Sequence, residues 1–327
     1  MTMQSIFRTL AALLLALSAS SAVSQSNYPT KPIRLVVPFA AGGGIDLMAR
    51  ITAQRLTEQL GQQVLVENQG GAGGTIASAA VARAAPDGYT FVFHSVSSAV
   101  VNAVVLTKLP YDPVNDFTPV TLAARFPLVM VINPDVPAKN VKEFVDLLKA
   151  NPGKYSYGSS GVGTGIHLAG ELFKSIAHVD IVHVPYKGTS AVMADLLAGR
   201  VSMLIDGVPP QVKNIKAGKV RALAVTTTRR SEVLPEVPTM IESGVPGYDI
   251  PFWTAIFAPA KTPAAIVEKI AAETGKAMKH PDAVARLKQV GAEGVGSTPA
   301  ELEHFWKQQL ALYGKIVKDS GIKLQNE

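Results

Sequence analysis

The chain has 327 residues, with 31 lysines and arginines, 25 aspartates and glutamates, and no cysteine. Without cysteine it can form neither disulfides nor thiolate metal sites, and it carries no cysteine nucleophile and no lipid-modified N-terminal cysteine. The formal net charge of +6 is scattered along the sequence rather than gathered in runs, which argues against nucleic-acid binding and fits anionic ligands only weakly.

The first 24 residues have the pattern of a secretory signal peptide. Arg8 precedes the apolar run from Leu10 to Leu17, and small residues follow from Ser18 to Ser24. The run is much shorter than the roughly 20 apolar residues of a spanning helix, so an uncleaved membrane anchor is the weaker alternative. We expect cleavage near Ser24 and a periplasmic protein of 303 residues, which is 327 minus 24.

The next hundred residues alternate predicted strands with predicted helices. A buried strand is expected at Ile33 to Val37, then the glycine-rich loop Pro38 to Gly44, then a helix with apolar spacing from Ile45 to Leu60. Further elements are a strand at Val64 to Val66, the glycine-rich loop Gly70 to Gly74, an alanine-rich helix, and a strand at Thr90 to Phe93. This β-α-β-α-β order predicts a doubly wound α/β lobe.

The same architecture restarts after the turn Asn151-Pro152-Gly153, without a repeat of the sequence. A strand at Lys154 to Tyr157 leads into the loop Gly158 to Gly165 and a helix from Ile166 to Ala177. Later strands are expected at Ile181 to Val184, Val201 to Ile205 and Arg221 to Val225, and later helices at Ser190 to Ala198, Pro210 to Ala217 and within Pro263 to Leu312. The last helical stretch should pack onto the first lobe.

These patterns predict two lobes with a ligand cleft between them. The first lobe combines residues 25–124 with 254–327, and the second comprises residues 125–253. We expect a monomer, because no long exposed apolar stripe stands out in the sequence.

Two junctions of strand, glycine loop and helix, Pro38 to Asp46 and Tyr157 to His167, are the candidate binding site. Ligands of open α/β sheets bind beyond the carboxyl ends of the strands, where helix N-termini present unpaired amides. A single junction of this kind is equally well a tight turn without a ligand, but two that face each other can hold one anion. Hydrogen bonds to a charged group contribute roughly 1.5 to 3 kcal/mol each, so a carboxylate can be held without arginine. Neither loop has the lysine pattern of a phosphate loop or completes a dinucleotide fingerprint.

Several single residues near these loops have two interpretations. Asp46 either binds a ligand ammonium or caps its helix, and His167 either faces the cleft or ties its helix to neighbours. Asp206, at the end of an apolar strand, is either a cleft residue or a buried cap. Phe252 and Trp253 either stack on a ligand or form the core of a lobe connection.

Catalysis and metal binding find little support in the sequence. Ser159, Ser160, His167 and Asp206 are the right types for acyl transfer, but Gly158-Ser159-Ser160-Gly161 lacks the residue that a nucleophile elbow places between serine and the second glycine. A hydrolase that uses Ser160 is therefore the weakest alternative. No histidine shares a helical face with an acidic partner at metal-ligand spacing, so we expect no metal, no cofactor and no enzymatic activity.

The order and spacing of short motifs resemble the periplasmic receptors of tripartite tricarboxylate transporters, the Bug family, over nearly all of the mature chain. The motifs are Lys31-Pro32-Ile33, Pro38-Phe39 with Gly42-Gly43 and Asp46, Pro86-Asp87-Gly88-Tyr89, Tyr157 to Thr164, His167 to Glu171, Val184 to Gly188, Leu223-Ala224-Val225, Pro235 to Thr239 and Ala258-Pro259.

This resemblance implies a two-lobed periplasmic-binding-protein type II fold, or Venus flytrap, in which each lobe is a doubly wound sheet flanked by helices. It also implies a receptor for a mono-, di- or aromatic carboxylate that passes its ligand to a membrane permease; a ligand sensor for a signalling system is the alternative. Carried over by position, the ligand-binding residues are Phe39, Ala40, Gly42, Gly43, Asp46, Ser159, Ser160, Gly161, Gly163, Thr164, His167, Tyr186, Lys187, Gly188 and Asp206.

The first loop departs from the family pattern at two positions. Ala41 stands where proline is usual, and Ile45 stands where a small polar residue is usual. We expect a looser loop and the loss of a hydroxyl contact, with the grip on the carboxylate retained.

Overall fold

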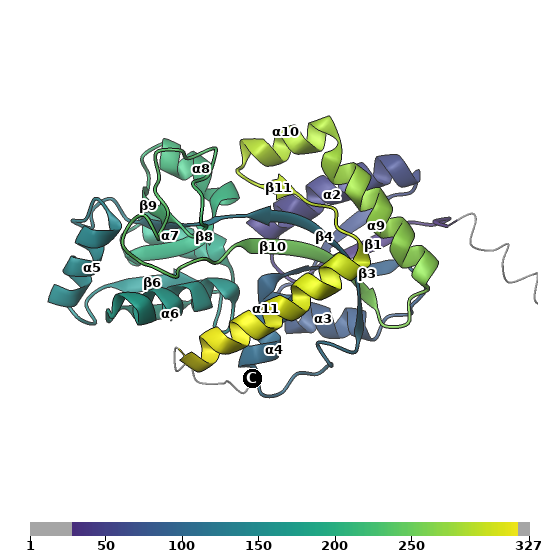
Figure 1. The fold of residues 1–327 in the computed structure, drawn as a ribbon, viewed down its shortest axis with the longest axis horizontal. Coiled ribbons are helices and arrows are strands. Elements are labelled where there is room, and N and C mark those ends of the chain that lie inside the picture. The colour runs from purple at the N-terminus through teal and green to yellow at the C-terminus, as the bar shows by residue number, and fades with distance from the viewer. Residues whose placement is uncertain (1–27, 320–327) are drawn as a thin grey trace, which may run out of the picture.

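The computed structural model describes residues 28–319, so the predicted signal peptide, residues 1–24, lies outside the described part. Two mixed β-sheets, each covered by helices, form two lobes that lie side by side (Figure 1). This architecture confirms the predicted α/β two-lobed class. No helix within residues 28–319 combines the length and apolarity needed to cross a membrane.

The first sheet has the strand order β11-β4-β10-β3-β1-β2. Strands β1 to β3 are parallel, whereas β10 pairs antiparallel with both β3 and β4. The strands are β1 (Ile33–Val37), β2 (Val64–Asn68), β3 (Thr90–Ser95), β4 (Phe117–Phe126), β10 (Phe252–Pro259) and β11 (Glu293–Gly294). The helices of the first lobe are α2 (Gly44–Leu60), η1 (Ala72–Gly74), α3 (Thr75–Ala82), η2 (Ser97–Val101), α4 (Asn102–Val105), α9 (Ala264–Lys279), α10 (Pro281–Gln289) and α11 (Pro299–Asp319).

The second sheet has the order β7-β6-β8-β5-β9, again with a parallel part and an antiparallel part. Its strands are β5 (Leu128–Ile132), β6 (Ser156–Ser159), β7 (Val182–Pro185), β8 (Met203–Gly207) and β9 (Arg221–Val225). Its helices are α5 (Val141–Ala150), α6 (Gly165–Ala177), α7 (Thr189–Leu197) and α8 (Val208–Lys216). Most predicted elements are present within two or three residues of their expected ends.

Three buried strands, β4, β5 and β10, were not predicted from the sequence. Every residue of β5 and β10 is buried, so their side chains fill the core on both faces instead of alternating. Trp253 is fully buried in β10, where its indole Nε1 donates to Gln309 Oε1 at 3.1 Å. Trp253 is therefore core, as the second of its two interpretations held.

Strands β4 and β10 run through the expected lobe boundaries at 124/125 and 253/254. They pair with each other along their length, with Phe126 opposite Phe252. The chain enters the second lobe after β4 and returns from it at β10 (Figure 1). The residue ranges of the two lobes remain a proposal.

The C-terminal helical stretch is broken into α9, α10 and α11 rather than continuous. Pro281 starts α10, and Gly291 and Gly296 adopt positive φ in the segment that follows it. Helix α9 packs on α2 and β4, and α11 packs on β4, which agrees with the expected contact with the first lobe.

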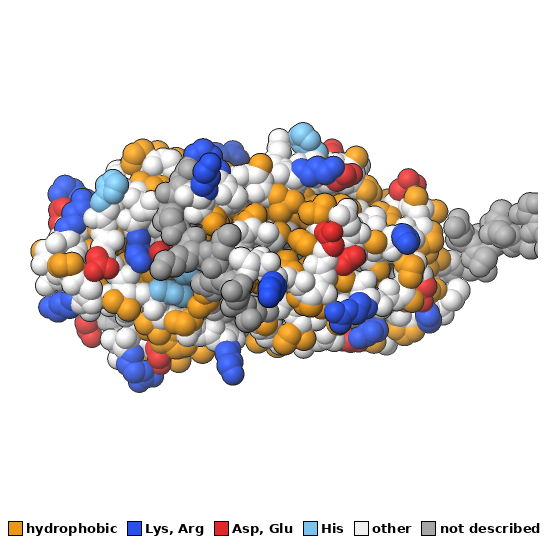
Figure 2. All heavy atoms as spheres, turned by 90° about the horizontal axis from the view of Figure 1, so that it is seen from below, with side chains coloured by type: hydrophobic (Ala, Val, Ile, Leu, Met, Phe, Trp, Pro, Cys, Tyr) orange, Lys and Arg blue, Asp and Glu red, His pale blue; other side chains and the backbone are white. Residues whose placement is uncertain are grey.

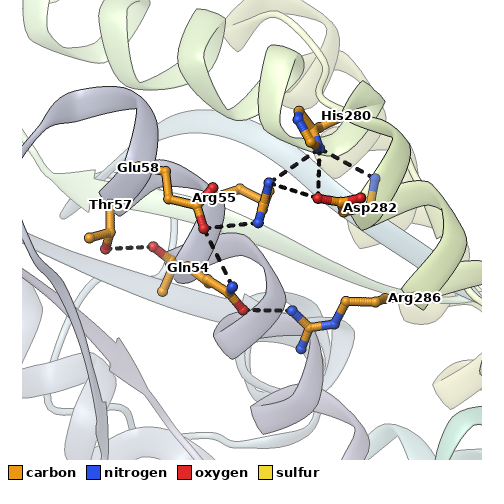
Figure 3. A network of polar contacts seen from close by, with 8 residues as sticks. Gln54, Arg55, Thr57, Glu58, His280, Asp282 and Arg286 are labelled. Carbon is orange, nitrogen blue, oxygen red and sulfur yellow. Dashed lines mark hydrogen bonds and ion pairs between the residues drawn. The ribbon is translucent and has the colours of Figure 1, made fainter.

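Helix α2 is tied to α10 by a polar network along its exposed side (Figure 3). Arg55 donates to Glu58 at 2.8 Å and forms an ion pair with Asp282 at 3.4 Å, while Arg286 donates to Gln54 at 2.6 Å. Together with its packing on α9, this network holds the helix whose N-terminus points between the lobes. Gly61 ends α2 in the left-handed conformation, with φ of 65°.

Candidate functional site

A cavity of about 790 Å³ lies between the lobes. The loops that follow β1, β2, β6, β7 and β8 all contribute to its walls, so the carboxyl ends of the parallel strands of both sheets converge on it. This volume is within the range of small-molecule sites. Elsewhere on the surface, lysines, arginines and acidic side chains are dispersed over the face that Figure 2 shows.

Ten of the fifteen predicted site residues line this cavity. They are Phe39, Ala40, Gly43, Asp46, Ser160, Gly161, Tyr186, Lys187, Gly188 and Asp206. The other five do not line the cavity: Gly42, Ser159, Gly163, Thr164 and His167. Four of these five are buried, whereas Gly42 is exposed in the loop after β1.

The first wall of the cavity is formed by the loop after β1 and by the N-terminus of α2, and no side chain caps this helix. Gly43 occupies the N-cap position with extended backbone. The first backbone bond of the helix runs from Leu47 N to Gly43 O, so the amides of Gly44, Ile45 and Asp46 have no partner among the described residues. These amides and the helix dipole give the cavity a concentrated positive end.

Asp46 braces the first loop. Its Oδ2 accepts from Gly42 N at 2.9 Å and from Arg50 Nε at 3.0 Å, and its Oδ1 accepts from Asn68 Nδ2 at 3.0 Å. Burial alone would raise the pKa of Asp46, but these hydrogen bonds outweigh it and lower the pKa. Its oxygens are already engaged, which favours a framework role over an ammonium site.

The second wall is formed by the loop before α6. Unlike the N-terminus of α2, the N-terminus of α6 is not open, so the expected pair of open helix ends is not present. Thr164 Oγ1 accepts from His167 N at 3.3 Å as the N-cap of α6, and Ser97 Oγ of the first lobe accepts from Gly165 N at 2.9 Å. The end of α6 is therefore largely satisfied by the protein. The loop before it still offers amides, because those of Ser160 and Val162 have no partner within the described residues, and both residues line the cavity.

Two stacked histidines support the second loop from behind. The rings of His167 and His183 lie 4.1 Å apart between centroids. His167 Nδ1 accepts from Gly163 N at 3.2 Å, and His183 Nε2 lies 2.7 Å from Ser159 Oγ. Burial lowers the pKa of both imidazoles, that of His183 to about 4, so both are neutral at pH 7. A neutral His167 is what the acceptor role toward Gly163 requires.

The histidine pair makes the fold sensitive to acid. The pKa of His183 in the folded protein is below the value of about 6.5 expected when unfolded, so the unfolded chain binds more protons between about pH 4 and 6.5. Stability should therefore fall as the pH is lowered through this window. Denaturant unfolding at pH 7.5, 6.5 and 5.5 gives the free energy of unfolding as a function of pH. Its slope should be smaller in His183→Gln than in the unmodified protein by up to about 1.4 kcal/mol per pH unit. Equal slopes in the two proteins would contradict this assignment.

Asp206 is buried beside the cavity, but its side chain caps neither α7 nor α8. It lines the cavity from the end of β8, and it accepts from Gln211 Nε2 at 2.8 Å as well as from the Gly207 amide and the Thr189 side chain. Burial raises its pKa to about 6 against the opposing effect of these hydrogen bonds. The cavity therefore loses a negative charge as the pH drops below neutrality.

The floor of the cavity is aromatic. The rings of Phe126 and Phe252 lie 5.3 Å apart at an interplanar angle of 33°. A methyl group added at Gly207 would lie 2.9 Å from Cε2 of Phe126, and one added at Gly165 would lie 3.2 Å from Cε2 of Phe252. The aromatic pair is thus packed between the carboxyl end of β8 and the N-terminus of α6. Phe252 both lines the cavity and belongs to the core.

The sequence interpretation missed several further lining residues. They include Gly70 to Gly74, Ile45, Asn102, Leu106, Phe126, Leu128, Val162, Ile166, Thr189 and Ser190. The glycine-rich loop after β2 was visible in the sequence and could have been assigned to the site. Phe126 and Leu106 carry no local signal, because only the tertiary fold brings them there.

The described residues give the hydrolase alternative no support. His183 lies against Ser159, which is fully buried, whereas Ser160 Oγ donates to Thr164 Oγ1 at 3.2 Å. Within residues 28–319, no group of three or more histidine and acidic side chains is arranged to hold a metal ion.

A model of the tripartite tricarboxylate transporter family receptor matches residues 48–322. BugT of Bordetella pertussis is 34% identical over 304 residues, which cover 93% of this chain and 93% of BugT.

Solved structures agree with the sequence matches. A protein of R. palustris solved with adipate has a TM-score of 0.88 and 36% identity, covering 90% of this chain and 99% of that one. MatC from Rhodopseudomonas palustris with bound malate has a TM-score of 0.84 and 32% identity, covering 89% of this chain and 100% of MatC.

Proposed function

The chain belongs to the receptor family of tripartite tricarboxylate transporters, and on this premise we propose that it captures a small carboxylate between its lobes for uptake by a membrane permease. The observation that carries the proposal is the uncapped N-terminus of α2, which opens into the cavity. Family members are solute-binding receptors rather than enzymes. The adipate and malate bound to two structural relatives support a carboxylate ligand.

We propose that the ligand carboxylate accepts hydrogen bonds from amides of both walls. Those of Gly44 and Ile45 belong to the first wall, and those of Ser160 and Val162 to the second. At roughly 1.5 to 3 kcal/mol for each bond to a charged group, three or four bonds suffice for micromolar affinity after the costs of ordering. The other predicted lining residues shape the cleft, while Gly42, Ser159, Gly163, Thr164 and His167 hold the loops in place.

We also propose how the receptor closes and where it acts. The lobes, residues 25–124 with 254–327 and residues 125–253, close around the ligand by movement at the β4 and β10 connections. The protein acts as a monomer in the periplasm after cleavage near Ser24.

A thermal-shift screen of residues 25–327 tests the proposal. Mono-, di- and aromatic carboxylic acids are each compared with the matching neutral amide. A ligand that binds only the folded state stabilises it by about 2.7 kcal/mol at a hundredfold excess over Kd, which gives a visible shift. We expect at least one acid to raise Tm while its amide does not. If amides shift Tm as much as their acids, carboxylate capture is wrong.

The charge of Asp206 should make this binding pH-dependent. Because its pKa is about 6, lowering the pH from 7.5 to 6 neutralises a growing fraction of a carboxylate that repels the ligand. Affinity for an acid that is ionised throughout this range should rise by about two- to tenfold, the size of a screened repulsion across the cavity. In Asp206→Asn the affinity measured by calorimetry should be nearly the same at pH 7.5 and at pH 6. The same pH dependence in both proteins would assign it to another group.

A further inference from the structure

We propose that the ligand is a monocarboxylate with an apolar body the size of a ring, and that Ile45 is a specificity-determining residue. This inference rests on the proposed function, since it concerns the part of the ligand beyond the captured carboxylate. It follows from what surrounds the open end of α2: its side chains, its aromatic floor and its charges.

Apolar side chains surround the cavity on several sides. They come from the first loop and helix α2, from the segment after α4, from the β4 and β10 connections and from α6, and they are Phe39, Ile45, Leu106, Phe126, Ile166 and Phe252. A ligand held at the end of α2 therefore meets hydrocarbon walls beyond its carboxylate. Each carbon that it buries there is favourable, at about 25 cal/mol per Å² of apolar surface removed from water.

The aromatic floor lies directly beside the proposed carboxylate position. A methyl group added at Gly44, the first residue of α2, would lie 3.8 Å from Cζ of Phe126. Phe126 in turn lies against Phe252, which reaches the start of α6 at Gly165. A flat apolar group attached to the carboxylate would lie over these two rings, in the geometry that aromatic pairs favour.

Ile45 lies at the point where the carboxylate joins the rest of the ligand. It is the second residue of α2, its own amide is one of the unpaired donors, and its half-buried side chain packs against the core while it lines the cavity. A branched aliphatic side chain offers no hydrogen bond at this position. A polar substituent next to the carboxylate would lose its water there without gaining a partner.

The charges of the lining disfavour a second carboxylate. The ionisable side chains with a formal charge that line the cavity are Asp46, Lys187 and Asp206. Asp46 is already paired with Arg50, Lys187 is exposed to solvent, and Asp206 is buried. A second carboxylate inside the cavity would face Asp206 or the hydrocarbon walls, with only a solvated lysine to offset its charge.

Two matched pairs of acids test this inference by calorimetry at pH 7.5. Hexanoate and adipate have the same six-carbon chain, and benzoate and terephthalate have the same ring, so each pair differs by one carboxylate. We expect each monoacid to bind at least tenfold tighter than its diacid. If either diacid binds as tightly as its monoacid, the inference is wrong and the proposed function stands. If none of the four acids binds while another acid raises Tm in the thermal-shift screen, the inference is wrong and the proposed function stands. If no acid in that screen raises Tm, the proposed function itself fails.

The variant Ile45→Ser tests the specificity role. We expect it to weaken benzoate binding at least tenfold, because a hydroxyl replaces hydrocarbon beside the ligand. The ratio of the benzoate affinity to the terephthalate affinity should fall as well. Ile241→Ser is the control, since Ile241 is exposed in the second lobe and does not line the cavity. It should leave all four affinities unchanged. An Ile45→Ser protein with an unchanged benzoate-to-terephthalate ratio would overturn the role of Ile45.

Discussion

Replacing Gly43 with aspartate should weaken carboxylate binding at least about 100-fold and should make the empty protein more stable. Gly43 has an ordinary φ of −85°, and a Cβ added there would meet no atom within 4 Å, so the fold tolerates a side chain. An aspartate at the N-cap would accept from the free amides of α2 and stabilise the helix by about 0.5 to 1 kcal/mol. It would then occupy the proposed ligand position and repel the ligand by several kcal/mol, at about 4 kcal/mol for charges 4 Å apart in a partly screened site.

Gly43→Ala is the matched control for this variant. Alanine adds the same Cβ without a charge or an acceptor, so affinity should change by no more than a fewfold, whereas the empty protein should become slightly less stable because alanine is a poor N-cap. Calorimetry and urea unfolding of both variants provide the two readouts. If the aspartate variant binds the acid as well as the alanine variant does, the end of α2 is not the carboxylate site.

Gly170→Ala should destabilise the second lobe by about 1 to 3 kcal/mol, the cost of overpacking a close contact. A Cβ at Gly170 would lie 2.2 Å from Cε2 of Tyr157, whose side chain is almost fully buried. The ring must therefore move. Tyr157 stacks on His183 and donates to Glu171 at 2.6 Å, so its displacement should also disturb the second loop and weaken ligand binding.

Gly314→Ala provides the same substitution in an open position. Gly314 lies within α11, and an added Cβ would have Val104 Cγ1, at 4.0 Å, as its nearest neighbour. Alanine is the better helix former, so this variant should gain about 0.5 to 1 kcal/mol. Urea midpoints of the two variants should thus move in opposite directions. A shift of both in the same direction would contradict the packing around Gly170.

The sequence predicts the parallel core of each lobe because the signals there are local. Apolar runs such as Ile33 to Val37 are followed by glycine-rich loops, and helical spacing begins directly after those loops. The antiparallel strands β4, β5 and β10 lack such signals, because they are largely buried and are joined to their sheets by pairing with distant residues. Short apolar runs of this kind are ambiguous until their partners are known.

The candidate site shows the same division between local and long-range information. The glycine loops are visible in the sequence, and ten of the fifteen proposed residues line one cavity. The asymmetry of the two helix ends is not visible, since α6 is closed partly by Ser97, a residue of the other lobe. For the same reason the aromatic floor of Phe126 and Phe252 emerges only once the two lobes are placed together.

Amide chemical shifts can show whether the unpaired amides of the two facing walls hold the ligand carboxylate. Uniformly ¹⁵N-labelled protein is titrated with the acid that gives the largest thermal shift, and with its neutral amide. The amide protons of Gly44, Ile45, Ser160 and Val162 should move downfield together as the acid saturates the protein, because each gains a hydrogen bond to a charged acceptor. If the acid binds but leaves these four signals in place, the ligand is held elsewhere and these amides are not the carboxylate site.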